Sequence, residues 1–250
     1  GSGHIAGRLI EDPALIDSVV EGLASLIEPA TYAQKYDLPD AESPLLFAMG
    51  DGNHSLATAK AIWEELKPHV SPDHPSRYAL VELVNLHDPS LKFEPIHRVL
   101  FNPGEDFETT LRLFFGEKLT LHSIADMQTL IAEVAKSTPT TQRFGMIQPD
   151  SYILCEVDHP IHNLAAGSLQ QFLDLYLKSH PDTKIDYVHG DDTVDELSRK
   201  PGNIGFFLPP IGKNSFFRTV IVDGALPRKT FSMNHAKDKR FYMECRRIKP

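Results

Sequence analysis

Hydrophobic residues recur at helical spacing in the segment EDPALIDSVVEGLASLIEP, residues 11–29. The apolar positions repeat every three or four residues, which is the period that places side chains on one face of a helix. Asp12 is suited to cap such a helix and Pro13 to occupy its first turn. The pattern therefore predicts an amphipathic helix. Comparable patterns predict helices at residues 54–67, 106–115, 123–137 (capped by Ser123), 168–180 and 193–200.

Short apolar runs bounded by turn-forming residues predict β-strands between these helices. The runs are PLLFAM (44–49), RYALVELVNL (77–86), FEPIHRVLF (93–101), RFGMIQ (143–148), YILCEVD (152–158), KIDYVHG (184–190), NIGFFLPP (203–210) and FYMECRRI (241–248). We expect residues 44–49 to be buried, and residues 77–86 to form a hairpin or neighbouring strands with residues 93–101. The segment 212–225 fits either a helix or a strand.

The order of these elements mixes helices with strands, which predicts an α/β or α+β fold with a mixed β-sheet flanked by helices. The chain has 250 residues and is 41% hydrophobic, so it can bury a substantial core. This length fits a single domain over residues 1–250, or two smaller lobes.

The composition disfavours several classes of protein. Cys155 and Cys245 lie far apart in the sequence, as expected of reduced thiols in a cytoplasmic protein. No apolar run approaches the roughly 20 residues of a membrane-spanning helix. The net charge is −9, although residues 228–250 are rich in Lys and Arg, so we do not expect a nucleic-acid-binding domain. We interpret this basic segment as a solvated edge strand or, alternatively, as a local anion-binding segment.

A glycine-rich turn, GDGNHS, lies between residues 44–49 and the helix predicted at 54–67. Gly50 and Gly52 let the backbone bend sharply and approach a ligand, while Asn53 or Ser55 could cap the helix. The first amides of a helix lack hydrogen-bond partners and lie at the positive end of its dipole, which suits a phosphate group. The alternative interpretation is a glycine-rich turn that binds nothing.

The carboxylate Asp51 does not fit a simple phosphate site, because two unit charges about 4 Å apart repel by about 4 kcal/mol at an effective dielectric of 20. Asp51 must therefore point elsewhere, bind a cation such as Mg²⁺, or act as a general base. His54 could donate a hydrogen bond to a phosphate or exchange a proton near neutral pH.

Polar residues at strand positions provide further candidates. His97 and Arg98 interrupt the apolar strand 93–101, where one of two adjacent residues faces the core if the sheet is covered on one face. His189 ends the strand 184–190, and strand ends are common places for ligand contacts. The other candidates are His4, His87, Asp88, Asp191, Asp192, Arg228 and Lys229. The zinc-protease, α/β-hydrolase and P-loop motifs are absent from the sequence.

The segment GDGNHSLATA resembles the Asp-Gly-His-His-Arg signature of a prokaryotic family described as domain of unknown function 1015. The resemblance extends through GSGHIAGRLIEDPALI, ALVELVNLHD, EPIHRVLF, YVHGDD and GALPRKTF, in that order. Members of this family usually carry an additional N-terminal part, so the resemblance implies that this chain is the C-terminal portion of a longer protein.

The family signature is in turn similar to the phosphate-binding box of the ParB/sulfiredoxin-like fold, which includes partition proteins, sulfiredoxins and free-serine kinases. By this analogy a ParB/sulfiredoxin-like element surrounds the turn. Asn53 and Ser55 depart from the signature, where the family has His and Arg. Because the phosphate-binding guanidinium is missing, either Arg98 or Lys229 replaces it, or the ligand carries less charge.

The leading hypothesis is an enzyme that handles a phosphorylated metabolite or nucleotide by phosphoryl transfer to or from a hydroxyl such as that of serine, a phosphotransferase or a phosphatase. Mg²⁺ and a nucleotide are the cofactors it allows, and a homo-oligomer is compatible with it. The catalytic candidates are Asp51, His54 and His97, and the ligand-binding candidates are Gly52, Asn53, Ser55, Arg98, His4, His189 and Lys229. The alternatives are a non-catalytic nucleotide-sensing or partner-binding module, and a purely structural domain.

Overall fold

The computed structural model describes residues 4, 6–38, 44–50, 52–224, 226 and 229–233. These residues form two compact units. The helical unit consists of the described residues up to Lys92 together with Met233, and the sheet unit is Phe93–Ser232. Among the described residues, no helix has the length and apolar character that crossing a membrane requires.

The helical unit contains α1 (Pro13–Ser25), α2 (Pro29–Tyr36), α3 (Asn53–Leu66) and the 3₁₀ helix η1 (Pro75–Arg77). The predicted amphipathic helix is confirmed as α1. Its N-cap is Asp12, whose side chain accepts a hydrogen bond from the Ala14 amide at 2.9 Å, and Pro13 occupies the first helical position. The helix predicted after the glycine-rich turn is confirmed as α3.

Two strand predictions in the helical unit are wrong, since neither 44–49 nor 78–86 forms a strand. The backbone amide and carbonyl of Leu45 instead bond to the hydroxyl of the buried Tyr32 on α2, at 3.1 and 2.8 Å. The apolar side chains of 78–84 are exposed, and Arg77 belongs to η1. An apolar, β-branched composition favours a strand only where a neighbouring strand completes its hydrogen bonds, and none does so here among the described residues.

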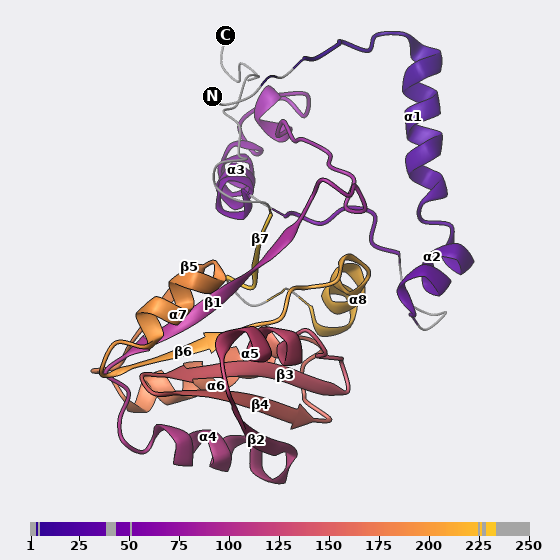
Figure 1. The fold of residues 1–250 in the computed structure, drawn as a ribbon. Coiled ribbons are helices and arrows are strands. Elements are labelled where there is room, and N and C mark those ends of the chain that lie inside the picture. Colours follow the sequence, from indigo (N-terminus) through magenta and orange to yellow (C-terminus); the bar gives the residue numbers. More distant parts are fainter. Residues whose placement is uncertain are drawn as a thin grey trace. The chain divides into compact units, whose positions relative to one another are not determined.

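The sheet unit is built on a seven-stranded sheet with the order β2-β4-β3-β6-β1-β5, in which β7 also pairs with β1 (Figure 1). The strands are β1 (Phe93–Phe101), β2 (Leu119–Ile124), β3 (Thr141–Gln148), β4 (Ser151–Asp158), β5 (Lys184–His189), β6 (Asn203–Phe207) and β7 (Phe231–Met233). The pairings with a described register are antiparallel, β3 and β4 forming a tight hairpin. The α+β fold is therefore confirmed, with antiparallel neighbours where we expected a mixed sheet.

Helices cover both faces of this sheet (Figure 1). They are α4 (Phe107–Phe115), α5 (Met127–Val134), α6 (Ala165–Ser179), α7 (Asp191–Ser198) and α8 (Lys213–Asp223), with the 3₁₀ helix η2 (Gly116–Lys118). Side chains of α4 and α6 pack into a core on one face, and side chains of α5 and α7 into a core on the other. We call these the α6 face and the α7 face. Because both are covered, strand β1, which lies between β6 and β5, is buried on both sides.

Three further expectations can be compared with the fold. Ser123 does not cap a helix, because it lies in β2 opposite Ile153 of β4, and Asp126 caps α5 instead. The ambiguous segment 212–225 contains a helix, α8, which buries Phe216 and Phe217. The hairpin expected between residues 77–86 and β1 is wrong, since β1 pairs with β5, β6 and β7. The strand predicted at 241–248 lies outside the described residues.

Candidate functional site

The start of α3 has the backbone geometry expected of an anion-binding turn. Gly52 is the N-cap residue and has φ +80°, a left-handed conformation that glycine adopts without strain. No side chain among the described residues caps the helix, so neither Asn53 nor Ser55 does so, contrary to expectation. Asn53, His54 and Ser55 are exposed in the first turn. Their amides lie at the positive end of the helix dipole.

A second glycine allows close packing next to this turn. A Cβ atom on Gly50 would lie 2.9 Å from both Cε and Sδ of Met233, which belongs to the same unit. A side chain at position 50 would therefore displace Met233. Between the two glycines stands Asp51, which lies outside the described residues.

His97 is fully buried on the α7 face of the sheet. Its Nδ1 accepts a hydrogen bond from the Leu208 amide at 3.1 Å, and its ring stacks on Phe207 with centroids 4.5 Å apart. Its Nε2 lies 3.6 Å from Asp191 Oδ1 at the start of α7. Because Nδ1 accepts, the proton of the neutral ring lies on Nε2, toward the Asp191 carboxylate. His97 therefore links the end of β6, through the Leu208 amide, to the start of α7, through Asp191.

Arg98 is also fully buried, on the α6 face. Its Nε donates to Gln170 Oε1 at 3.3 Å, its Nη1 donates to the carbonyl of Ile96, and its Cζ lies 5.2 Å from the centroid of the Tyr187 ring. Burial lowers the pKa of Arg98 to about 10, while the charges of Tyr187 and Asp174 act in the opposite direction. At neutral pH the side chain therefore carries a buried positive charge.

The charge of Arg98 is incompletely balanced within the described structure. Gln170 Nε2 donates to Asp174 Oδ1 at 2.9 Å, so the amide of Gln170 lies between the guanidinium and the Asp174 carboxylate. Arg98 Nη2 is buried and has no hydrogen-bond partner in the described part of the chain. Removing an ion from water costs several kcal/mol even after relaxation, and the charge of Asp174 offsets part of that cost for Arg98.

His189 is exposed at the end of β5, opposite Ile96 of β1. Tyr187 lies opposite Arg98, and side chains of antiparallel register partners share a face of the sheet. His189 therefore stands on the α6 face with Arg98, whereas His97 faces the other side. We expected either His97 or Arg98 to face a core. In the structure both do, because His97 is buried in the core on the α7 face and Arg98 in the core on the α6 face.

The candidate residues therefore fall into separate groups. The helical unit holds the turn residues Gly52, Asn53, His54 and Ser55, and the sheet unit holds His97, Arg98 and His189. His4 and Lys229 are exposed, and neither makes a described contact with another candidate residue. Lys229 has φ +57°, in the left-handed region.

Gln170 and Tyr187, which contact the guanidinium of Arg98, are not among the candidate residues predicted from the sequence. Both could have been found from periodicity. Gln170 shares a helical face with Ala166 and Leu173, so a polar residue there must enter the core. Tyr187 precedes His189 by two residues and so shares its strand face.

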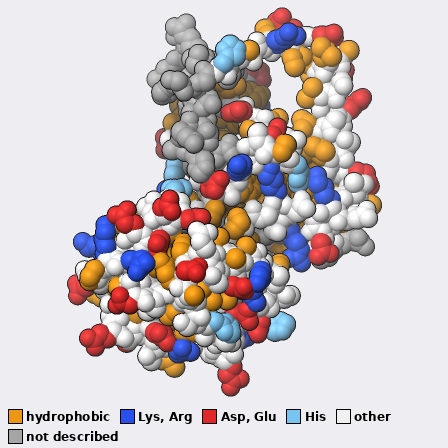
Figure 2. All heavy atoms as spheres, in the orientation of Figure 1, with side chains coloured by type: hydrophobic (Ala, Val, Ile, Leu, Met, Phe, Trp, Pro, Cys, Tyr) orange, Lys and Arg blue, Asp and Glu red, His pale blue; other side chains and the backbone are white. Residues whose placement is uncertain are grey.

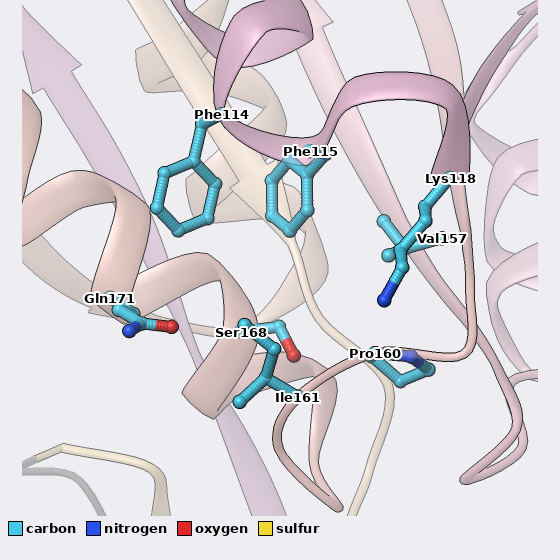
Figure 3. Close-up of a pocket in the computed structure, with 8 residues that line it drawn as sticks. All are labelled: Phe114, Phe115, Lys118, Val157, Pro160, Ile161, Ser168 and Gln171. Carbon is cyan, nitrogen blue, oxygen red and sulfur yellow. The ribbon is translucent and has the colours of Figure 1, made fainter.

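A cavity of about 150 Å³ lies on the sheet unit away from all candidate residues (Figure 3). It is lined by Phe114, Phe115, Lys118, Val157, Pro160, Ile161, Ser168 and Gln171. Its polar groups are engaged in internal hydrogen bonds, as Lys118 Nζ donates to the carbonyl of His159 and Ser168 Oγ to Gln142 Oε1. Most of the residues that line the cavity are apolar.

No group of three or more potential metal ligands occurs among the residues that the structure describes. On the face that Figure 2 draws, acidic, basic and hydrophobic side chains are interspersed over the described residues. Among the described residues on this face, no large basic patch of the kind typical of nucleic-acid-binding proteins is seen.

Comparisons with known proteins give a family and one similar structure. The structure is a mutant free serine kinase in complex with AMP, with a TM-score of 0.45, 10% sequence identity, and coverage of 72% of this chain and 80% of that chain. No curated protein matches the chain significantly. The family model described as "Protein of unknown function (DUF1015)" matches residues 2–176. Since this match spans well over half of the sequence, the chain belongs to the DUF1015 family.

Proposed function

We propose that the chain is an enzyme that binds the phosphate group of a small metabolite or nucleotide at the start of α3 and transfers a phosphoryl group to or from a hydroxyl such as that of serine. The observation that carries this proposal is the exposed first turn of α3, which follows Gly52 at φ +80° and has no side-chain cap among the described residues. The similarity of the signature to the phosphate-binding box of the ParB/sulfiredoxin-like fold supports it.

Phosphate binding at this turn follows from the chemistry of helix ends. The amides of Asn53, His54 and Ser55 have no carbonyl partner within α3, and the aligned peptide dipoles place about half a positive charge there. A phosphate group satisfies these donors and this charge together. The left-handed Gly52 keeps side-chain atoms away from the position that the phosphate occupies.

In the proposed reaction the attacking hydroxyl forms a bond to phosphorus as the bond to the leaving oxygen breaks, and the hydroxyl proton passes to a base. Asp51 is the proposed base, or a ligand of Mg²⁺ that neutralises the phosphate oxygens. His54, exposed in the first turn, donates a hydrogen bond to the transferred group. His97 takes no proton in this scheme, because its Nδ1 is occupied by the Leu208 amide.

The test is binding and turnover by the full chain. Calorimetric titration with ATP, AMP and phosphoserine, with and without Mg²⁺, measures affinity, and ³¹P NMR follows phosphoryl transfer. Ser55→Arg restores the cation of the family signature and is expected to tighten phosphate binding about tenfold, as one charge-assisted contact provides. Absence of binding by every compound would refute the proposal.

Ala57→Arg is the matched control for Ser55→Arg. It adds the same charge to an exposed position of α3, but two residues further along, where the side chain points to another side of the helix. Its affinity should equal that of the unmodified chain. Equal tightening by both variants would mean that net charge, and not the turn, attracts the ligand.

A non-catalytic nucleotide-sensing module is the second candidate function. It is favoured by Ser55, which removes the signature cation, and by the engagement of His97 in the core of the sheet unit. This function predicts affinity without turnover, and a change of oligomeric state when the nucleotide binds. Light scattering after size-exclusion chromatography, with and without ATP, separates it from the enzyme.

A further inference from the structure

The cavity of the sheet unit combines apolar walls with a basic side chain (Figure 3). Phe114 and Phe115, at the end of α4, meet edge to face with ring centroids 4.8 Å apart, and both pack against the hydrophobic core. Val157 of β4 is a buried part of the wall, and Lys118 of η2 is the basic residue. Ligand pockets are typically of this kind, mostly apolar with a few polar groups that orient the ligand.

The size of the cavity limits the ligand to a small molecule, and its position makes it accessible. Its volume is about 150 Å³. An engineered apolar cavity of about 150 Å³ in another protein binds benzene, so this volume holds one ring. Three of the residues that line the cavity are exposed, namely Lys118, Ile161 and Gln171. The entrance therefore lies at the surface of the sheet unit.

Hydrogen bonds fix the backbone of the wall that contains Ile161. On one side of this residue the His159 amide donates to the Thr140 carbonyl at 2.8 Å. On the other side the His162 carbonyl accepts a hydrogen bond from Gln142 Nε2 at 2.6 Å. The wall is therefore in place before a ligand binds, which reduces the entropy lost on binding.

The charge of Lys118 indicates the polar end of the ligand. Its Nζ donates to the carbonyl of His159 at 2.8 Å, a neutral acceptor that uses one of its three N–H donors. No carboxylate of the described residues forms an ion pair with this ammonium group. A ligand carboxylate at the same position would meet an opposite charge and donors that no described residue uses.

We propose that this cavity binds a small aromatic carboxylate, with its ring against Phe114, Phe115 and Ile161 and its carboxylate at Lys118 Nζ. The two phenylalanine rings favour an aromatic ring over an alkyl chain, because contacts between aromatic rings add to the effect of buried area. This site goes beyond the proposed function, because it lies in the sheet unit and requires no residue of α3.

The proposal is tested by NMR titration of the full chain with three probes. Benzoate carries the ring and the charge, benzyl alcohol carries the ring without the charge, and acetate carries the charge without the ring. The δ1-methyl signal of Ile161 is identified by its loss in Ile161→Val, a conservative change at an exposed position. Benzoate is expected to shift this signal saturably, with a Kd about fivefold below that of benzyl alcohol and further below that of acetate.

Lys118→Met removes the charge and keeps a long aliphatic side chain. It should raise the Kd for benzoate about fivefold, the effect of losing one exposed ion pair, and leave the Kd for benzyl alcohol unchanged. Lys200→Met is the matched control, because Lys200 is also exposed but follows α7 and does not line the cavity. The Kd of this control for benzoate should equal that of the unmodified chain.

Three outcomes would overturn the proposal. An Ile161 signal that does not shift saturably with benzoate means that the cavity takes no ligand of this class. Equal Kd values for benzoate and acetate mean that the apolar walls contribute nothing. An equal Kd for benzoate in Lys118→Met and in the unmodified chain means that Lys118 does not recognise the carboxylate. Ser55→Arg should not change the benzoate titration, so failure here is distinguishable from failure of the phosphate site at α3.

Discussion

His97 and Arg98 are consecutive residues of β1, and their side chains lie in different cores of the sheet unit. The imidazole contacts Phe207 and the Leu208 amide on the α7 face, whereas the guanidinium contacts Gln170 and Tyr187 on the α6 face. Adjacent side chains of a strand point to opposite faces of the sheet, so Arg98 and His97 do not line the same side of it. The two residues therefore have separate roles, which separate substitutions can test.

Replacing His97 should destabilise the sheet unit through the Leu208 amide. His97→Leu removes the acceptor of a buried N–H, and leaving such a donor unsatisfied costs about 1–3 kcal/mol. His97→Asn offers an oxygen near the position of Nδ1 and should lose less of the free energy of unfolding. Urea denaturation followed by circular dichroism measures both. Equal losses would show that the hydrogen bond contributes nothing specific.

Gly205→Ala should disrupt the packing of α7 on β6. An added Cβ would lie 1.6 Å from Ser198 Oγ and 2.6 Å from Ser198 Cβ, and Ser198 is fully buried. Forcing a methyl group into a packed core typically costs about 1–3 kcal/mol. Gly22→Ala on the exposed helix α1 is the contrasting variant, because a Cβ there meets nothing within 4 Å. It should be neutral or stabilise the chain by up to about 1 kcal/mol. Thermal denaturation of the two variants measures both effects: the midpoint should fall for Gly205→Ala and stay unchanged or rise for Gly22→Ala.

Cys155 should resist thiol reagents in the folded chain. It is fully buried, and burial raises its pKa far above the ordinary thiol value of 9.0. A Cys245→Ser variant leaves Cys155 as the single thiol. We expect a thiol-specific chromogenic reagent to react with it only after unfolding in urea. Rapid reaction of the native protein at pH 8 would contradict the burial.

The same raised pKa predicts how stability changes with pH. Below about pH 9 the Cys155 thiol keeps its proton in both the folded and the unfolded chain, so its contribution to the free energy of unfolding is fully present. Above that pH only the unfolded chain releases the proton, so the free energy of unfolding falls as the pH rises. Cys155→Ala, compared with the parent at pH 8 and pH 10, should show a smaller fall.

Asp51→Asn tests the proposed base at the start of α3. The amide preserves the size of the side chain but accepts no proton, so turnover should be abolished. Ligand binding should be unchanged or tighter, because the repulsion between the carboxylate and a phosphate is removed. Turnover by ³¹P NMR and affinity by calorimetry measure the two effects. Unchanged turnover would exclude Asp51 from the mechanism.

Local signals predicted most of the helices and most of the strands of the sheet unit. The helix start at Asp12 and Pro13 is confirmed because capping depends only on neighbouring residues. The strands predicted at 143–148 and 152–158 are confirmed as β3 and β4, since a short polar turn lies between two apolar runs. Residues 44–49 and 77–86 have equally apolar sequences and form no strand.

The candidate residues of the sheet unit could be predicted in part. Arg98 was identified because a charged residue in an apolar strand must find a partner, and the structure supplies Gln170 from α6, 72 residues later in the chain. The sequence indicates that a partner is needed without indicating which residue it is, because that depends on how α6 lies across the sheet.

By itself, the sequence determined most of the helices, a fold that combines helices with a β-sheet, and the polar residues that interrupt apolar strands, since each depends on a short-range pattern of side chains. Only the tertiary structure decided which apolar runs join the sheet, that both faces of β1 are covered, and that Arg98 and Tyr187 meet with donors that no described residue pairs. Strand pairing and the contacts of buried side chains join residues that are distant in sequence. Their free energy therefore depends on the packing of the folded chain and cannot be read from neighbouring residues.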